Sequence, residues 1–267
     1  MKSGLNLYSL NKFIKTDEGY LDTLQKLKEM GYAYVQFSGR EFNAELIKKG
    51  IDESGLPVVL THNPLARFLE DSDKLMEDHD FIGCKNIGLG SFGGLGAYRD
   101  ENRFKELVEK LNIIAEKLVK NGYKFFYHNH HMEFVKMSNG QTMYDYMIEN
   151  APYFNYTIDT HWLQYGGVSV IEYVKKLSGK IECVHLKDFG VSIKTDEEEL
   201  KKAVKTTDQL NFNIMPVGDG NMNFKDIVEA CKESGTKYFI VEQDNACTFE
   251  DPFGQVKRSC DYIAENL

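Results

Sequence analysis

The sequence is short of the features that mark membrane proteins, linkers and exported proteins. It has no apolar stretch long enough to span a bilayer. It has no proline-rich, serine-rich or single-charge segment that would mark a linker, so we predict one domain over residues 1–267. The first residues run directly into the strand-like segment Leu5–Tyr8, and we expect no secretory leader. These absences favour a cytoplasmic protein that does not bind membranes.

Cysteine is scarce and follows no pattern. There are five cysteines, an odd number, and they contain no C-x-x-C pair. Such a set indicates reduced thiols rather than a disulfide framework, and it is not the cysteine set of a structural zinc site. Cys183 lies two residues before His185 on one predicted strand, so we expect it to fill the interior of the fold.

Concentrated positive charge is also missing. The net charge is −9 and the sequence pI is about 5.4, which argues against a nucleic-acid partner because phosphate binding needs a basic surface. The pair Lys201–Lys202 closely follows Glu197–Glu199, a pattern typical of a solvated helix face. The glycines of Gly88–Gly96 do not form G-x-G-x-x-G, so they predict no dinucleotide site.

What the sequence does contain is a regular alternation of strand and helix patterns. The predicted strands are Leu5–Tyr8, Tyr34–Phe37, Pro57–Thr61, Asn86–Leu89, Tyr123–His128, Tyr156–Asp159, Ile181–His185 and Tyr238–Glu242. The predicted helices are Tyr20–Met30, Glu45–Ile51, Lys74–Asp80, Glu101–Asn121, Thr142–Glu149, Val170–Leu177 and Phe224–Ser234. Eight strands joined by helical crossovers predict an α/β fold with parallel pairing and, at this length, a closed (β/α)8 TIM barrel. A doubly wound open sheet is the alternative.

Polar clusters lie at the ends of the last four predicted strands. They are Tyr127–Phe134, Ile158–Trp162, Val184–Asp188 and Val241–Asp244. Ligands bind at the ends of parallel strands, and these clusters deliver Glu or His, then Asp, His and Glu to one rim. This set predicts a single divalent metal ion held by nitrogen and oxygen ligands.

Three of the four candidate ligands are assigned directly. Asp159 closes its strand, although it could instead cap the next helix. His185 is followed at once by Lys187 and Asp188, and such crowding is costly to bury unless the charges are paired or bound to an ion. Glu242 ends an almost wholly apolar strand, so it is a ligand or a base, with an ion pair to Lys187 as the alternative.

The first ligand has two candidates. If Phe126 faces the barrel interior, strand alternation makes His128 the natural ligand. Glu133 lies in the following loop and could fold back over the ion, as a site dominated by oxygen ligands would prefer. His62 and Gln36, on earlier strands, are weaker candidates for contacts to a substrate. The turn Gly218–Gly220 is predicted as a plain turn.

Together these motifs resemble the sugar phosphate isomerase/epimerase family, the xylose-isomerase-like TIM barrels. The resemblance rests on Tyr127-His128-Asn129-His130-x-x-Glu133-Phe134, His185-x-Lys187-Asp188, Gly218-Asp219-Gly220 and Glu242-Gln243-Asp244. It implies a manganese, cobalt, zinc or magnesium ion, with Asp159, His185 and Glu242 as three ligands. It also favours a carboxylate as the first ligand, hence Glu133, although the chain has His128-Asn129-His130 where many relatives have Glu-Asn-His.

Such a site implies proton transfer beside the carbonyl of a ketose or keto-sugar, catalysed by an isomerase or epimerase. We expect Glu242 to act as one acid/base group and Glu133 or His130 as the other. We expect the substrate-binding residues to be His128, His62, Trp162, Lys187 and Asp244. Trp162, Phe37 and Tyr8 could form a wall against the apolar face of the sugar. The alternative is a dehydratase or lyase acting on an inosose or a 3-keto-sugar. A non-catalytic sugar-binding barrel and an endonuclease-type phosphodiesterase are less favoured, and a homo-oligomer is left open.

Overall fold

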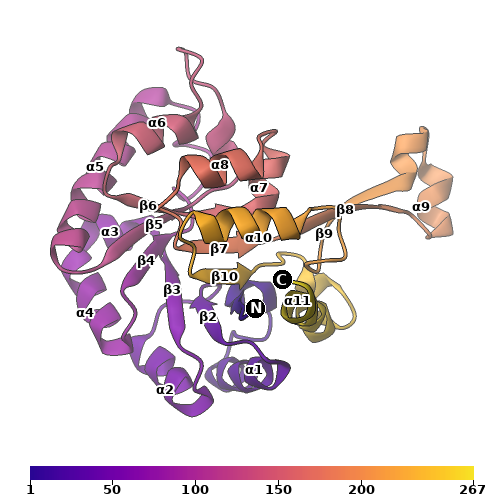
Figure 1. Cartoon of the computed structure of the whole chain (residues 1–267), viewed down its shortest axis with the longest axis horizontal. Coiled ribbons are helices and arrows are strands. Elements are labelled where there is room, and N and C mark those ends of the chain that lie inside the picture. The colour runs from indigo at the N-terminus through magenta and orange to yellow at the C-terminus, as the bar shows by residue number, and fades with distance from the viewer.

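The eight strands at the centre of the molecule close into a parallel barrel (Figure 1). The computed structural model describes residues 1–267, apart from the side chain of Glu199. The order around the barrel is β1 (Gly4–Asn6), β2 (Tyr34–Phe37), β3 (Val58–Asn63), β4 (Asn86–Leu89), β5 (Lys124–His128), β6 (Phe154–Asp159), β7 (Cys183–Leu186) and β10 (Tyr238–Val241). Because β1 pairs with both β2 and β10, the barrel prediction is confirmed and the open sheet is excluded.

Helices surround the barrel and cover its strands (Figure 1). They are α1 (Asp17–Met30), α2 (Ala44–Ser54), α3 (Leu65–Glu70), α4 (Ser72–Ile82), α5 (Glu101–Lys120), α6 (Met143–Asn150), α7 (Thr160–Tyr165), α8 (Val170–Lys176), α9 (Glu197–Lys202), α10 (Phe224–Glu233) and α11 (Pro252–Asn266). The longest, α5, begins at the N-cap Asp100 and buries one stripe of side chains: Phe104, Val108, Leu111, Ala115 and Leu118. Spacings of three and four residues place them on one face of the helix, against the sheet. No helix among the described residues is long and apolar enough to cross a membrane.

Strand alternation builds two layers inside the barrel. The lower layer is a buried apolar cluster of Tyr34, Val59, Leu60, Phe126, Cys183 and Ile240. Two residues further along five of these strands, on the same face, lie polar side chains: Gln36, His62, His128, His185 and Glu242. The apolar layer therefore closes the barrel below, and the polar layer lies at the carboxyl ends. Cys183 occupies the interior, as predicted.

The first strand is shorter than predicted. Its extended part ends at Asn6, and Leu7–Leu10 form a single 3-10 turn instead of continuing the strand. The side chain of Asn6 accepts a hydrogen bond from the backbone N–H of Tyr8, which stabilises the turn. This turn lifts Tyr8 out of the barrel wall to the rim, where it is 43% exposed.

Between β7 and α10 the chain forms an antiparallel ribbon that sequence patterns did not predict. β8 (Asp188–Ile193) pairs with β9 (Leu210–Met215), and α9 lies at the far end of the ribbon, which projects from the barrel (Figure 1). The register places Val191 opposite Phe212 and Ile193 opposite Leu210. One face of the ribbon is therefore apolar. In α9, Lys201 and Lys202 are exposed, as a solvated helix face requires.

Candidate functional site

Four buried side chains meet at the carboxyl ends of β5, β6, β7 and β10. His128, Asp159, His185 and Glu242 each offer one ligand atom, and these atoms all lie within 4.8 Å of one another. The strand register brings them together, because His185 lies beside Asp159 on β6 and beside Ile240 on β10. Glu242 is two residues beyond Ile240 and so points into the same space.

The two candidates for the first ligand lie in different surroundings. Glu133 is fully buried, and its Oε1 accepts hydrogen bonds from the hydroxyls of Tyr98 and Tyr127, each at 2.7 Å. Its Oε2 accepts the backbone N–H of His130 at 2.8 Å. Both carboxylate oxygens therefore accept hydrogen bonds from groups outside the barrel interior. Phe126 does face that interior, and His128 takes the position that the resemblance assigned to a carboxylate.

Asp159 caps the next helix with one carboxylate oxygen and faces the other converging residues with the second. Its Oδ1 caps α7 by accepting the backbone N–H of Trp162 at 2.9 Å. Its Oδ2 lies 2.9 Å from Nζ of Lys187 and 3.9 Å from Nδ1 of His185. The backbone N–H of Asp159 donates to Asn129 at 3.0 Å, which fixes the end of β6. Burial raises the pKa of Asp159 to about 6, so the carboxylate is ionised at neutral pH.

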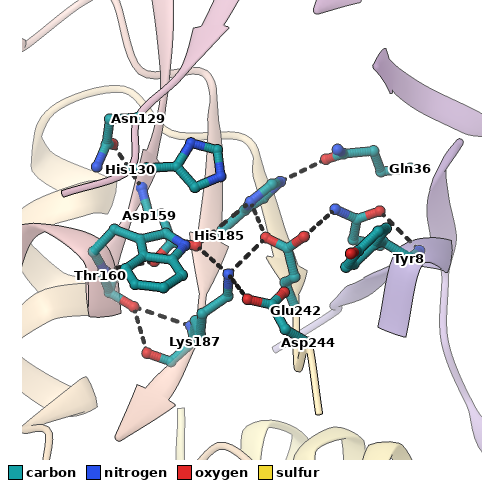
Figure 2. A network of polar contacts seen from close by, with 12 residues as sticks. Tyr8, Gln36, Asn129, His130, Asp159, Thr160, His185, Lys187, Glu242 and Asp244 are labelled. Carbon is teal, nitrogen blue, oxygen red and sulfur yellow. Dashed lines mark hydrogen bonds and ion pairs between the residues drawn. The ribbon is translucent and has the colours of Figure 1, made fainter. Parts of the chain in front are cut away.

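Lys187 places a buried positive charge among three carboxylates (Figure 2). Its Nζ lies 2.9 Å from Asp159, 3.2 Å from Glu242 and 3.1 Å from Asp244. Burial would lower the pKa of the lysine, but the three carboxylates outweigh burial and raise it. Burial likewise acts to raise the pKa of Glu242, yet Lys187 and His185 hold it well below the usual value. Lys187 and Glu242 are therefore both charged.

His185 and Glu242 are held by side chains from the first two strands of the barrel, β2 and β1 (Figure 2). Nε2 of His185 lies 2.6 Å from Oε1 of Gln36, and Nδ1 lies 2.7 Å from Oε2 of Glu242. The amide of Asn6 donates to Oε1 of Glu242 at 2.7 Å, and Ser38 in turn donates to Asn6. Sequence patterns did not single out Asn6 or Ser38, since short polar residues near strand ends carry no distinctive signal.

Two further histidines, His62 and His130, and Asp244 border the same space. The ring of His128 lies 5.2 Å from that of His62 and 4.6 Å from that of His130. Burial lowers the pKa of His62 to about 3 and that of His130 to about 4, so both are neutral imidazoles. Asp244 closes the other side, beside Lys187.

This space opens into a pocket of about 520 Å³ at the barrel mouth. Its lining includes the predicted residues His62, His128, His130, Lys187, Glu242 and Asp244. It also includes Tyr8, Ser38, Asn63 and the glycine-rich loop Gly90–Gly93. A side chain at Gly90 would approach the ring of His62 within 3.2 Å, so glycine lets this loop close over the pocket.

Two predicted positions lie elsewhere. Phe37 packs against Tyr20 and Phe42 on the helix side of the sheet, not against the pocket. The ring of Trp162 lies 5.1 Å from Nζ of Lys187 but lines a neighbouring pocket.

The turn Gly218–Gly220 donates two backbone N–H groups to Asp188, and a Cβ at Gly220 would lie 2.3 Å from that carboxylate. It is a turn that anchors the base of the ribbon, as predicted.

The four converging residues fit a divalent metal ion. Nδ1 of His128 is a buried atom without a hydrogen-bond partner in the described part of the chain. Nδ1 of His185, Oδ2 of Asp159 and Oε2 of Glu242 are buried beside it and contact Lys187 and one another, so the two carboxylates share one ammonium. An ion at this point would bind the imidazole nitrogens and balance the carboxylate charge that one lysine leaves. Two imidazoles and two carboxylates are ligands that zinc, cobalt and manganese accept.

Fold and site together define a (β/α)8 barrel with a candidate metal-binding group at the carboxyl ends of its strands. Residues 24–266 match the model of the xylose isomerase-like TIM barrel family, and the chain belongs to that family.

Among curated proteins the chain is similar to inosose dehydratases. One from Clostridium perfringens is 28% identical over 176 residues, which cover 62% of this chain and 56% of that protein. Another, from Geobacillus thermodenitrificans, is 26% identical over 167 residues, covering 62% and 55%. The chain thus spans little more than half the length of these relatives.

Solved structures share the fold over nearly the whole chain. A sugar phosphate isomerase/epimerase from Parabacteroides distasonis has a TM-score of 0.78 at 21% identity, covering 99% of this chain and 94% of that one. The 3-keto-D-glucoside 4-epimerase from E. coli has a TM-score of 0.69 at 16% identity, covering 99% of each. At these identities the similarity establishes the fold alone.

Proposed function

We propose that this protein is a metal-dependent isomerase or epimerase that moves a proton beside the carbonyl of a ketose or keto-sugar. The observation that carries the proposal is the buried convergence of His128, Asp159, His185 and Glu242 next to the Lys187 ammonium. A site this rich in charge is expensive to bury, and it faces a pocket large enough for a sugar. Family membership and the enzymes among its relatives support a catalytic role.

The metal would be held by His128, Asp159, His185 and Glu242. When bound, it would polarise the oxygens of the substrate and stabilise negative charge that develops beside the carbonyl. The protein's own contribution is to orient these ligands: Gln36 on β2 holds His185, and Asn6 on β1, the strand beside β10, holds Glu242.

Glu242 is the proposed base. Asn6 restrains its Oε1, while Oε2 lies 2.7 Å from Nδ1 of His185 and 3.2 Å from Nζ of Lys187. Because its pKa is held low, the carboxylate is ionised and can accept a proton from a substrate carbon at the pocket.

His130 is the proposed second acid/base group. Its Nδ1 is buried without a partner among the described residues, and the side chain lines the pocket. A neutral imidazole that lines the same pocket as Glu242 can serve as the second proton donor or acceptor, which an epimerase requires. Glu133 is not retained in this role, because its carboxylate is sequestered by Tyr98 and Tyr127. It instead positions His130 through the backbone N–H.

The remaining pocket side chains are proposed to bind the substrate. Lys187 offers a fixed ammonium to a substrate oxygen that gains negative charge. Asp244, which lines the pocket beside Lys187, suits a sugar hydroxyl, and His62 offers an unpartnered Nε2.

A dehydratase is the second candidate, and the similarity to inosose dehydratases favours it. The reaction begins with the same proton removal and differs only in the loss of a β-hydroxyl as water. His130 or Lys187 would then stand next to the leaving oxygen and supply the proton.

The test is exchange of a substrate proton with solvent. The metal-loaded protein is incubated in heavy water with ketoses, inososes and 3-keto-sugars, and carbon-bound deuterium is followed by NMR. We expect label at one carbon beside the carbonyl, with a new epimer or aldose as product. An unsaturated product would favour the dehydratase. Metal-loaded protein that exchanges no proton of any member of the panel would refute proton transfer and favour a sugar-binding barrel.

A further inference from the structure

Beside the catalytic pocket lies a second one, of about 400 Å³, that the proposed reaction does not use. Most of its lining consists of rings: His131, His161, Trp162, Tyr165, Phe189 and Phe212. Asn213, Ile214 and Asn245 complete the wall. None of the described residues that line it is an acid, a lysine or an arginine.

The two pockets share a wall. His130 and Asp244 line the catalytic pocket, whereas the next residue of each, His131 and Asn245, lines the aromatic pocket. Trp162 stands at the boundary, with its ring 5.1 Å from Nζ of Lys187 and 5.7 Å from the ring of His130. The two pockets are therefore neighbours at the barrel mouth, with Trp162 between them.

The rings form one connected group around Trp162. Ring centroids lie 5.0 Å apart for His131 and Trp162, 4.5 Å for His161 and Trp162, and 5.9 Å for Trp162 and Tyr165. Tyr165 is 59% exposed, although an aromatic side chain gains free energy from burial. The wall therefore presents apolar ring surface that no part of the described chain covers.

The same pocket holds polar atoms without partners. Nδ1 of His161 and Nε1 of Trp162 are buried and make no hydrogen bond within the described residues. The side chain of His161 is only 3% exposed. Buried groups of this kind normally find a partner, and both side chains line the pocket.

We propose that the aromatic pocket binds a second sugar ring, so that the substrate of the proposed reaction is a glycoside or disaccharide carrying a keto-sugar. This inference rests on the proposed function for the identity of the reacting ring. A pyranose matches the wall in two ways: its C–H face packs on aromatic rings, and its hydroxyls can pair with His161 and Trp162. The absence of charged residues from the described lining disfavours a phosphate group in this position.

The ribbon supplies the outer wall of this subsite. Phe189 comes from β8, and Phe212–Ile214 come from β9. The ring of Phe189 lies 4.8 Å from that of His161, which ties the base of the ribbon to α7. The base of the projecting ribbon thus completes a site for the part of the substrate that does not react.

Binding can be tested without knowing the substrate, because Trp162 is the only tryptophan in the chain. Maltose, cellobiose, lactose and trehalose, and the methyl glucosides as single-ring probes, are titrated into the metal-loaded full-length protein while tryptophan fluorescence is recorded. We expect at least one disaccharide to change the emission and to bind about three- to tenfold more tightly than its methyl glycoside, as one aromatic contact provides.

Two variants test the wall itself. Tyr165→Ala and Phe212→Ala remove exposed rings, and we expect each to reduce the preference for the disaccharide over the methyl glycoside by about threefold or more. Phe81→Ala is the matched control, because Phe81 is an exposed phenylalanine on α4, outside both pockets. It should leave the preference unchanged.

The outcomes separate this inference from the proposed function. Equal binding of every disaccharide and its methyl glycoside, or an unchanged preference in both wall variants, overturns the second-ring subsite, even if keto-sugars exchange protons. Disaccharide binding that depends on Tyr165 and Phe212 supports the subsite, even if no substrate proton exchanges and the proposed reaction is wrong.

Discussion

Gln36 on β2 reaches across the barrel to His185 on β7, with 2.6 Å between Oε1 of the amide and Nε2 of the imidazole. The amide oxygen accepts the Nε2 proton, which leaves Nδ1 as the nitrogen that faces Asp159 and Glu242. Gln36 on β2 therefore determines that Nδ1 is the His185 nitrogen available to Asp159 and Glu242. Partners of this kind commonly tune metal affinity without touching the ion.

Gln36→Leu removes that acceptor. We expect the metal affinity to fall about 10- to 100-fold, because the imidazole loses the group that fixes its orientation and its proton. Affinity is measured by competition with a chelator of known strength. Gln36→Glu, which retains an acceptor, is the control and should lose less. Equal affinities for Gln36→Leu and the unaltered protein would show that Gln36 does not act through His185.

Replacing the two rivals for the first ligand should have unequal effects. His128→Ala removes one of the four converging residues, and we expect at least about a tenfold loss of metal affinity. Glu133→Gln keeps an oxygen that accepts from Tyr98 and Tyr127, so metal should be retained. Elemental analysis after dialysis distinguishes them. Metal lost from the Glu133 variant and kept by the His128 variant would restore the carboxylate as ligand.

Lys187→Met leaves three carboxylates without their buried counter-charge. We expect a loss of unfolding free energy of about 3–5 kcal/mol in the presence of chelator, because an unpaired buried charge is strongly destabilising. Bound metal should reduce this loss of stability, because its positive charge would replace that of Lys187 beside Asp159 and Glu242. Denaturant unfolding with and without metal measures the difference. Lys26→Met, which breaks an exposed ion pair with Asp22, should cost less than about 1 kcal/mol.

Acid should weaken the fold through a histidine that is distant from the reaction. His79 is fully buried, with Nε2 2.7 Å from the Thr61 hydroxyl and Nδ1 2.6 Å from the Leu75 carbonyl. Burial lowers its pKa from 6.5 to about 4. Between these values the unfolded chain binds the proton and the folded protein does not, so stability falls as the pH decreases from 6.5 to 4. The full contribution is about 3 kcal/mol.

His79→Gln should flatten this dependence. We expect the variant to be less stable than the unaltered protein at pH 7 but to lose less stability on acidification, as measured by urea unfolding with chelator present. The exposed residue His131 provides the control, and His131→Gln should keep the original slope. Parallel pH profiles for the His79 variant and the unaltered protein would assign the acid sensitivity to other groups.

The barrel could be predicted because its strands are buried on both faces. Runs such as Tyr238–Val241 are almost wholly apolar, and helices with a clear apolar stripe separate them. Three of the four converging residues could be predicted directly, since Asp159, His185 and Glu242 lie where such runs end. The ends of the predicted strands, together with the alternation of side chains along each strand, therefore predict which residues face the site.

The first ligand could not be decided in this way. The carboxylate of Glu133 is removed from the site by Tyr98, which precedes it by 35 residues and contacts it only in the folded protein. The ribbon was missed for a related reason. β8 and β9 alternate apolar with polar or glycine residues, but the charged segment containing α9 separates them, so neither resembles a barrel strand. Contacts between distant residues determine both features.

Closure of the barrel also sets the order in which this protein can mature. β1 must pair with β10, and Asn6 must reach Glu242, so the first and last strands complete the site together. A chain still being synthesised carries β1 and β7 with open edges until β10 emerges from the ribosome. Until then it holds at most three of the four converging residues, together with two unpaired strand edges that invite misassembly. Chemical competence and protection from aggregation are therefore acquired in the same late step.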